Sequence, residues 1–129
     1  MAELNNIVCI DDEPDIRGLV KMILETVGNF TVKDYCNGPT ALEALKNQTP
    51  DMLLIDGMMP EMSGMDVLKE INKMEHLKNT PVAFMTARIQ PKEKEEYISL
   101  GASGIIEKPF EPMELPDLVR SIWEKAQSK

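Results

Sequence analysis

The sequence predicts an α/β fold, a doubly wound sandwich in which helices cover both faces of one parallel sheet. Five short apolar segments alternate along the chain with segments of helical length, which is the pattern of repeated β-α units. The apolar segments are nearly continuous rather than alternating, as Met52-Leu53-Leu54-Ile55 shows. Such runs suit strands that are buried on both faces, as strands of a covered parallel sheet are.

The strands are expected at residues 6–10, 30–35, 51–55, 81–85 and 104–107. Each of the segments after them is long enough for one helix. In the first such segment, apolar side chains recur at the i, i+3 and i+4 spacing of one buried helix face: Ile16, Leu19, Val20, Ile23, Leu24 and Val27. The sequence therefore predicts five strands and five helices in alternation.

Proline, glycine and serine mark the ends of the expected helices. Pro14 lies where the first helix should start, and Gly28-Asn29 lies where it should end. Ser63-Gly64 precedes the third helix, and Pro91 and Pro112 open the last two. These local signals agree with the apolar pattern.

Length and composition are those of one soluble domain. The chain has 129 residues, 43% hydrophobic and 28% charged, which suffices for a single core. We expect one domain over residues 1–129, with no linker, repeat or output domain. No apolar run approaches the roughly 20 residues that cross a membrane, and residues 1–6 do not resemble a secretory leader. A cytoplasmic protein without a membrane partner is expected.

Charge and cysteine content exclude other classes. The net charge of −8 repels polyphosphate, so direct nucleic-acid binding is disfavoured. Cys9 and Cys36 have no spacing that suggests metal or redox chemistry, and both are interpreted as buried free thiols. Met58, Met59 and the nearby methionines are interpreted as core-filling residues.

The residues that follow the expected strands carry the chemistry. They are Asp11, Asp12 and Glu13 after the first strand, Asp56 after the third, Thr86 and Ala87 after the fourth, and Lys108 after the fifth. Ligands of open parallel sheets bind at the carboxyl ends of the strands. We therefore expect three aspartates, a hydroxyl and an amine to converge on one edge of the sheet.

This residue set favours a metal ion and phosphoryl chemistry. Clustered carboxylates repel one another unless a cation lies between them, and oxygen ligands favour Mg²⁺ or Mn²⁺. Asp56 has no second acid two residues on, so it is free to act as a nucleophile that forms an acyl phosphate. Lys108 can neutralise phosphoryl oxygens, and the Thr86 hydroxyl and the backbone N–H groups of Met58 and Ala87 can donate to them.

Four short motifs lie at these strand ends in a fixed order. They are Asp11-Asp12-Glu13, Asp56-Gly57-Met58-Met59-Pro60, Thr86-Ala87 and Lys108-Pro109-Phe110, with Gly101-Ala102-Ser103-Gly104 before the fifth strand. Together they resemble the signature positions of response-regulator receiver domains, over essentially the whole chain. One such motif would be weak, but four in the right order and spacing are specific.

The resemblance implies a flavodoxin-like sheet with strand order 2-1-3-4-5. It also implies that Asp56 accepts a phosphoryl group from a sensor histidine kinase, a phosphotransfer protein or a small phosphodonor. Asp12, Asp56 and the Met58 carbonyl would bind Mg²⁺, with Mn²⁺ as a possible substitute, and Asp11 would hold the metal through water. The chain would not be an enzyme on external substrates, although it would catalyse its own phosphorylation and slow dephosphorylation.

The resemblance further implies a switch. Thr86 and Lys108 would move toward the phosphoryl group and remodel the face formed by the fourth helix, fifth strand and fifth helix, where a downstream protein docks. Many receivers carry an aromatic residue three places before the site lysine, but this chain has Ile105. Ala87, Arg88 and Ile105 are thus expected to modulate the response, and the fourth helix or its preceding loop is expected to carry the change.

Particular residues argue against three rival functions. An aspartyl-nucleophile phosphatase needs a second acid two residues after the nucleophile, where this chain has Met58. A flavin carrier needs a hydroxyl- and glycine-rich phosphate loop, where this chain has Asp11-Asp12-Glu13. A phosphorylation-independent interaction module would not need the acceptor residues, and all of them are present.

Overall fold

The computed structural model describes residues 3–87 and 90–127 of the chain. Within these ranges the strands are β1 (Asn6–Ile10), β2 (Thr31–Tyr35), β3 (Met52–Asp56), β4 (Val82–Ala87) and β5 (Gly104–Lys108). The helices are α1 (Pro14–Thr26), α2 (Gly38–Leu45), α3 (Gly64–Ile71), α4 (Pro91–Ser99) and α5 (Leu115–Gln127). Two short 3₁₀ helices, η1 (Glu75–Leu77) and η2 (Pro112–Glu114), complete the described elements.

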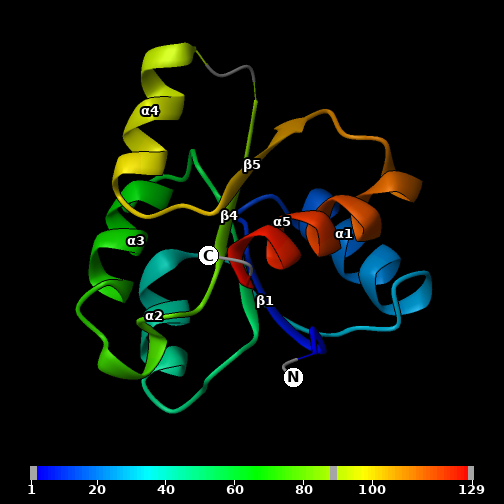
Figure 1. The fold of residues 1–129 in the computed structure, drawn as a ribbon, viewed down its shortest axis with the longest axis horizontal. Coiled ribbons are helices and arrows are strands. Elements are labelled where there is room, and N and C mark those ends of the chain that lie inside the picture. The colour runs from blue at the N-terminus through cyan, green and yellow to red at the C-terminus, as the bar shows by residue number, and fades with distance from the viewer. Residues whose placement is uncertain (1–2, 88–89, 128–129) are drawn as a thin grey trace.

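The five strands form one parallel sheet in the order β2-β1-β3-β4-β5. Helices α1 and α5 cover one face of this sheet, and α2, α3 and α4 cover the other (Figure 1). The predicted doubly wound α/β fold and its strand order are confirmed. The chain reverses its winding direction between β2 and β3, so the carboxyl ends of β1 and β3 lie side by side at the switch point where such folds bind ligands.

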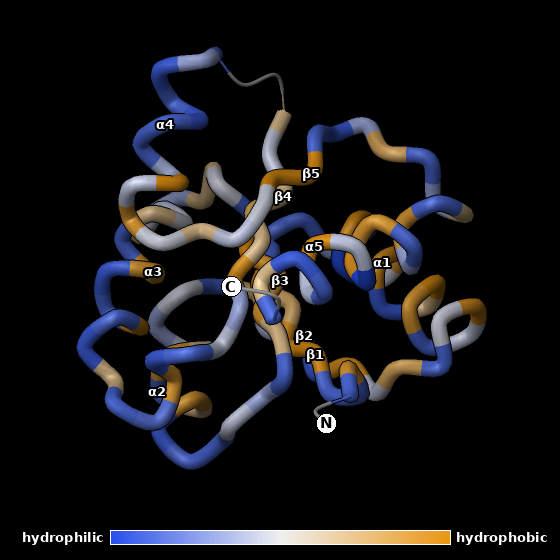
Figure 2. Tube along the Cα trace, viewed as in Figure 1, coloured by the Kyte–Doolittle hydropathy of each residue, from blue (hydrophilic) through white to orange (hydrophobic). Residues whose placement is uncertain are grey.

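Each strand sends alternate side chains into two separate cores. On β1, Ile7 and Cys9 pack toward α1 and α5, whereas Val8 and Ile10 pack toward α2 and α3. All five residues of β3 are buried, as expected for a central strand covered on both faces. Figure 2 shows hydrophobic residues along the strands and hydrophilic residues along much of α4.

Several expected helix ends agree with the structure. Pro14 is the first residue of α1 and Pro91 the first of α4. Ser63 caps α3, because its side chain accepts from the backbone N–H of Asp66 and the Asp66 carboxylate accepts from that of Ser63. Pro112 opens η2 rather than the last helix directly, since a 3₁₀ turn comes before α5.

Three strands extend further than the sequence indicated. Asp56 is the last residue of β3, Thr86 and Ala87 end β4, and Lys108 ends β5. Each of these residues is in register with a residue of a neighbouring strand, for example Asp56 with Met85 and Thr86 with Glu107. The strand ladder therefore holds the backbone of the polar site residues, which a prediction based on apolar runs could not show.

Two expectations about sulfur-containing residues were partly wrong. Cys9 is buried as expected, but Cys36 is exposed because it lies just after the edge strand β2. Met59 packs against the core on the α2 and α3 side, whereas Met58 is 72% exposed. Met58 lies in the turn after β3, beyond the last residue that the sheet buries.

Across the described residues, no helix is both long enough and apolar enough to span a membrane.

Candidate functional site

Three aspartates meet where β1 and β3 end. Asp11 and Asp12 follow β1, and Asp56 ends the neighbouring strand β3. Each offers a carboxylate oxygen, and these oxygens lie within 4.8 Å of one another. The structure thus brings together the three acids that the sequence singled out, in a cluster small enough for one cation to contact all of them.

Asp56 is 3% exposed and only partly paired. Its Oδ1 accepts from the backbone N–H of Met58 at 3.2 Å and lies 3.4 Å from Lys108 Nζ. Its Oδ2 is buried without a hydrogen-bond partner among the described residues. Burial and the negative charge of Asp11 raise the pKa of Asp56 to about 7, while Lys108 and the Met58 N–H hold it down.

An unpaired buried carboxylate oxygen is costly, and a divalent cation would satisfy it. The remaining donors of the cluster are carboxylate oxygens, which are the ligands that Mg²⁺ prefers. The residues present therefore fit a hard divalent metal ion. Since Asp12 is only half-buried, the cluster is open on one side, where a metal could keep bound water.

Asp11 is the anchor of the cluster. Its side chain is fully buried; Oδ1 accepts from the backbone N–H of Glu13 at 2.9 Å, and Oδ2 accepts from Lys108 Nζ at 3.2 Å. Its backbone carbonyl accepts from Arg17 at 2.9 Å. With both carboxylate oxygens already engaged, Asp11 is held in place as a fixed negative charge beside Asp56.

Lys108 crosses the site from β5. Its ammonium lies within 4 Å of three carboxylates, those of Asp11, Glu13 and Asp56, and its side chain is 13% exposed. Burial alone would lower the pKa of Lys108, but the charges of Asp11 and Asp56 outweigh burial and raise the pKa above its ordinary value. Lys108 is therefore a permanent cation next to Asp56.

Thr86 and Ala87 lie beside the aspartate cluster, at the end of β4. Thr86 is buried, and its hydroxyl donates a long hydrogen bond of 3.4 Å to the Ala87 carbonyl. Ala87 itself is exposed at the mouth of the site. Arg88, which the sequence also assigned to this site, lies outside the described residues.

One residue near the site was not predicted. Tyr97 of α4 is buried, and its hydroxyl shares a hydrogen bond with the Thr86 side chain. Ile105, the expected substitute for an aromatic residue, is half-buried and packs against the same core as Tyr97. A signal was present in the sequence, since Tyr97 is the one aromatic residue in the highly charged helix α4.

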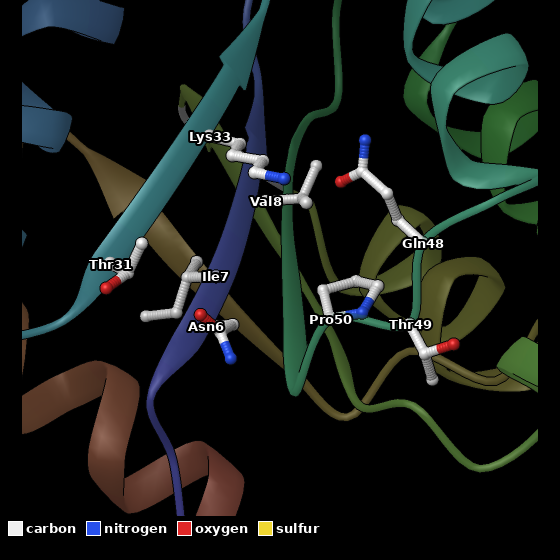
Figure 3. A pocket seen from close by; sticks show the side chains of 8 residues that line it. All are labelled: Asn6, Ile7, Val8, Thr31, Lys33, Gln48, Thr49 and Pro50. Carbon is white, nitrogen blue, oxygen red and sulfur yellow. The ribbon is translucent and has the colours of Figure 1, made fainter.

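The site does not coincide with the cavity shown in Figure 3. That cavity, of about 250 Å³, is lined by Asn6, Ile7 and Val8 on β1, Thr31 and Lys33 on β2, and residues 48–50 before β3. Most of these residues lie toward the amino ends of the strands. The cavity therefore lies toward the edge of the sheet opposite to the one where Asp56 lies. None of the site residues lines it.

Comparison with protein families gives one match that covers most of the chain. A family model described as the response regulator receiver domain matches residues 7–120. This range includes all four of the strand-end motifs.

Similar curated proteins and solved structures agree with this match. The response regulator Rre1 of Synechocystis sp. is 31% identical over 128 residues, which are 99% of this chain and 55% of that protein. The transcriptional regulatory protein SrrA of Staphylococcus aureus is 36% identical over 124 residues, 96% of this chain and 50% of that protein. The chain thus spans about half the length of these relatives. The structure of chemotaxis response regulator CheY4 of Vibrio cholerae superposes with a TM-score of 0.86 at 28% identity, covering 93% of this chain and 99% of that one.

Proposed function

This chain belongs to the response regulator receiver domain family, and we propose that its Asp56 accepts the phosphoryl group in a two-component signalling pathway. The observation that carries this assignment is the incomplete pairing of the buried Asp56 carboxylate. It is the one carboxylate of the cluster that has a buried oxygen without a partner among the described residues, and it lies 3.4 Å from a lysine ammonium.

The proposed reaction is a phosphoryl transfer. A carboxylate oxygen of Asp56 attacks the phosphorus of a phosphohistidine or an acyl phosphate, a new O–P bond forms, and the bond from phosphorus to the donor breaks. The donor leaves with the electron pair of that bond. Because catalysis of such transfers depends mainly on positioning and on charge stabilisation, the side chains around Asp56 need only hold charges and hydrogen bonds in place.

We assign the metal to the aspartate cluster. Asp12, Asp56 and the Met58 carbonyl would bind Mg²⁺ or Mn²⁺ directly, and Asp11 would hold it through water. When bound, the ion would neutralise the charge that develops on the phosphoryl oxygens. Asp11 accepts from Lys108 and from the Glu13 N–H, so it fixes the position of the lysine beside Asp56.

The other side chains would contact the phosphoryl group. Lys108 is already within 3.4 Å of Asp56 Oδ1, so its ammonium needs little movement to pair with a phosphoryl oxygen. The Thr86 hydroxyl and the Ala87 backbone N–H at the end of β4 would donate hydrogen bonds to the other oxygens. A phosphatase that turns over external esters is not favoured, because Met58 stands where its second acid would be.

We further propose that residues 1–129 form one cytoplasmic receiver domain that is phosphorylated by a sensor histidine kinase or a phosphotransfer protein. Its downstream protein partner would dock on the face that α4, β5 and α5 form. Because β5 carries Lys108 and the end of β4 leads toward α4, this face is the one most directly connected to the phosphoryl site.

Intact-mass measurement tests the acceptor. The protein is incubated with Mg²⁺ and acetyl phosphate or phosphoramidate, and we expect the wild type to gain one phosphoryl group. Asp56→Asn keeps the size of the side chain but removes the nucleophilic charge, so it should gain none. Asp117→Asn, a change at an exposed aspartate of α5, is the matched control and should behave like the wild type. Phosphorylation of Asp56→Asn at the wild-type rate would show that the acceptor is another residue.

A further inference from the structure

Helix α4 is attached to the domain through a single buried side chain. Among its residues, all of which the structure describes, only Tyr97 is buried, at 3% exposed. Ile98, the other large apolar residue of the helix, is 47% exposed. The Tyr97 ring packs against Phe84 of β4, with 4.3 Å between the ring centroids and 40° between the ring planes. The position of α4 beside α3, as Figure 1 shows, therefore depends strongly on the contacts of Tyr97.

The hydroxyl end of Tyr97 reaches the phospho-acceptor loop. Gly57 directly follows Asp56, and a Cβ atom at Gly57 would collide with the Tyr97 hydroxyl. The same Cβ atom would lie 3.2 Å from both Cβ and Oγ1 of Thr86. Tyr97, Thr86 and the Gly57 backbone therefore form one tight contact beside Asp56. The absence of a side chain at Gly57 is what lets a residue of α4 enter it.

Within this contact the hydroxyls of Tyr97 and Thr86 share a hydrogen bond. Burial raises the pKa of Tyr97, and the bond with Thr86 offsets this only in part, so the phenol keeps its proton. A buried phenol that loses its hydrogen-bond partner is destabilised, because no water replaces the partner. The state of Thr86 therefore affects how well Tyr97 is held, and with it α4.

We propose that Tyr97 is the positioning residue that couples Thr86 to α4: its hydroxyl holds Thr86 in the unphosphorylated protein and loses that bond when Thr86 turns to a phosphoryl group on Asp56. This inference rests on the proposed function of Asp56. One side-chain rotation fixes the position of the Thr86 hydroxyl oxygen, so turning it toward the phosphoryl group takes it away from Tyr97. Phosphorylation thus weakens the one buried anchor of α4.

The coupling also has an energetic direction. Since the bond to Tyr97 stabilises the unphosphorylated arrangement of Thr86, it opposes binding of a phosphoryl group. Removing it should strengthen that binding by about fivefold, the value of one ordinary net hydrogen bond. Ile105 of β5 has an aliphatic side chain and no hydroxyl, so it has no hydrogen bond to exchange with Thr86.

The test uses Tyr97→Phe, which removes one oxygen atom and keeps the ring on Phe84. The probe is beryllofluoride with Mg²⁺, a stable mimic of the phosphoryl group, titrated into the full chain. We expect Tyr97→Phe to bind it about fivefold more tightly than the wild type. Tyr35→Phe is the matched control, because the Tyr35 hydroxyl accepts from Gln48 on the far edge of the sheet and should leave the affinity unchanged.

A double-mutant cycle separates positioning from a general structural effect. In a Thr86→Ala background, Tyr97→Phe should have no effect on affinity, since no Thr86 hydroxyl remains to be released. In a Thr86→Ser background, which keeps the hydroxyl, the effect should return. Hydrogen exchange of the α4 amides gives a second readout: beryllofluoride should accelerate it in the wild type, and Tyr97→Phe should show faster exchange before any ligand is added.

The results separate this inference from the proposed function. If the wild type gains no phosphoryl group by intact mass, the assignment of Asp56 fails and the inference fails with it. If the wild type is phosphorylated but Tyr97→Phe binds beryllofluoride like the wild type, or changes affinity equally in the Thr86→Ala background, only the role of Tyr97 is overturned. A melting curve for each variant establishes that it is folded. The effect of beryllofluoride on hydrogen exchange of the α4 amides is measured on the wild type, so it does not depend on any variant folding.

Discussion

The ammonium of Lys108 lies 3.2 Å from a carboxylate oxygen of Asp11, a residue with no exposed surface. The two residues come from the ends of β1 and β5, which are not neighbours, because β3 and β4 lie between them in the sheet. The ion pair therefore spans the edge of the sheet, with Asp56 of β3 3.4 Å from the same ammonium. Among the described residues, Lys108 is the cation that pairs with both buried aspartates and offsets their charge.

The first prediction concerns removal of that cation. Lys108→Met should destabilise the metal-free protein by about 2–4 kcal/mol, because it leaves a buried carboxylate without its counter-charge. Urea unfolding in EDTA measures the change. Lys73→Met is the control, since Lys73 pairs with Glu70 on the exposed side of α3 and the loss should stay below about 1 kcal/mol. Equal losses in the two variants would contradict the structural role of Lys108.

The second prediction concerns pH. The pKa of Asp56 rises from 3.8 to about 7 on folding, mainly through burial and then through Asp11. Between these values the folded protein holds a proton that the unfolded chain has released. The contribution of Asp56 to the free energy of unfolding is therefore fully present below about pH 4. It is lost as the pH rises through about 7. The metal-free wild type should lose on the order of 2 kcal/mol between pH 5 and pH 8.

Urea unfolding in EDTA at pH 5 and pH 8 measures this loss. Asp56→Asn cannot titrate at this position, so its stability should change less than that of the wild type over the same interval. The difference between the two proteins removes the contribution of the other ionisable groups. Identical pH dependence in both proteins would show that Asp56 is already ionised at pH 5.

The agreement between sequence and structure is closest where one physical constraint dominates. Apolar runs gave the five strands because a sheet covered on both faces excludes polar side chains, and β3 is buried along its whole length. The meeting of Asp11 and Asp56 followed from the parallel order of the strands, which brings their carboxyl ends to one edge. These features depend on the fold as a whole and not on details of packing.

What the sequence did not show depends on contacts between elements that are distant along the chain. Tyr97 reads as one aromatic residue in a charged helix, and only the packing of α4 brings its hydroxyl to Gly57 and Thr86. Cys36 was expected to be buried as part of an apolar strand-like run, but it follows β2, which is an edge strand with an exposed end. Burial at the end of a strand depends on its neighbours, which local sequence does not specify.

The third prediction concerns the metal. Mg²⁺ should bind with a dissociation constant roughly in the high micromolar to millimolar range, as expected for a site with few carboxylates that keeps bound water. Asp12→Ala should remove most of this binding. Asp15→Asn, a change at an exposed residue in the first turn of α1, is the control for a loss of general negative charge. Amide NMR titration measures both, and an unchanged titration of Asp12→Ala would exclude Asp12 as a ligand.

The fourth prediction concerns the contact between Gly57 and Tyr97. Gly57→Ala should destabilise the protein by about 1–3 kcal/mol, because its Cβ collides with the Tyr97 hydroxyl. In a Tyr97→Phe background the cost should be smaller, since the colliding oxygen is gone. Gly18→Ala in α1 is the control, because nothing lies within 4 Å of its Cβ, and it should be neutral or stabilising. Equal costs of Gly57→Ala in both backgrounds would mean that the two residues do not touch.

The last prediction concerns the lifetime of the acyl phosphate on Asp56. Rapid hydrolysis requires a polar side chain that orients a water molecule in line with the bond to be broken. The two positions expected to supply it are occupied by Met58 and Arg88, and the thioether of Met58, 72% exposed beside the acceptor, donates no hydrogen bond. We therefore expect phospho-Asp56 to persist for minutes or longer. Met58→Asn with Arg88→Glu should shorten its lifetime about tenfold, which corresponds to about 1.4 kcal/mol of barrier.

Intact mass, followed over time after removal of the phosphodonor, measures the lifetime of phospho-Asp56. Met113→Asn, a change at another exposed methionine, is the control. Complete release from the wild type within seconds, or slower release from the double variant, would contradict this account of the two positions.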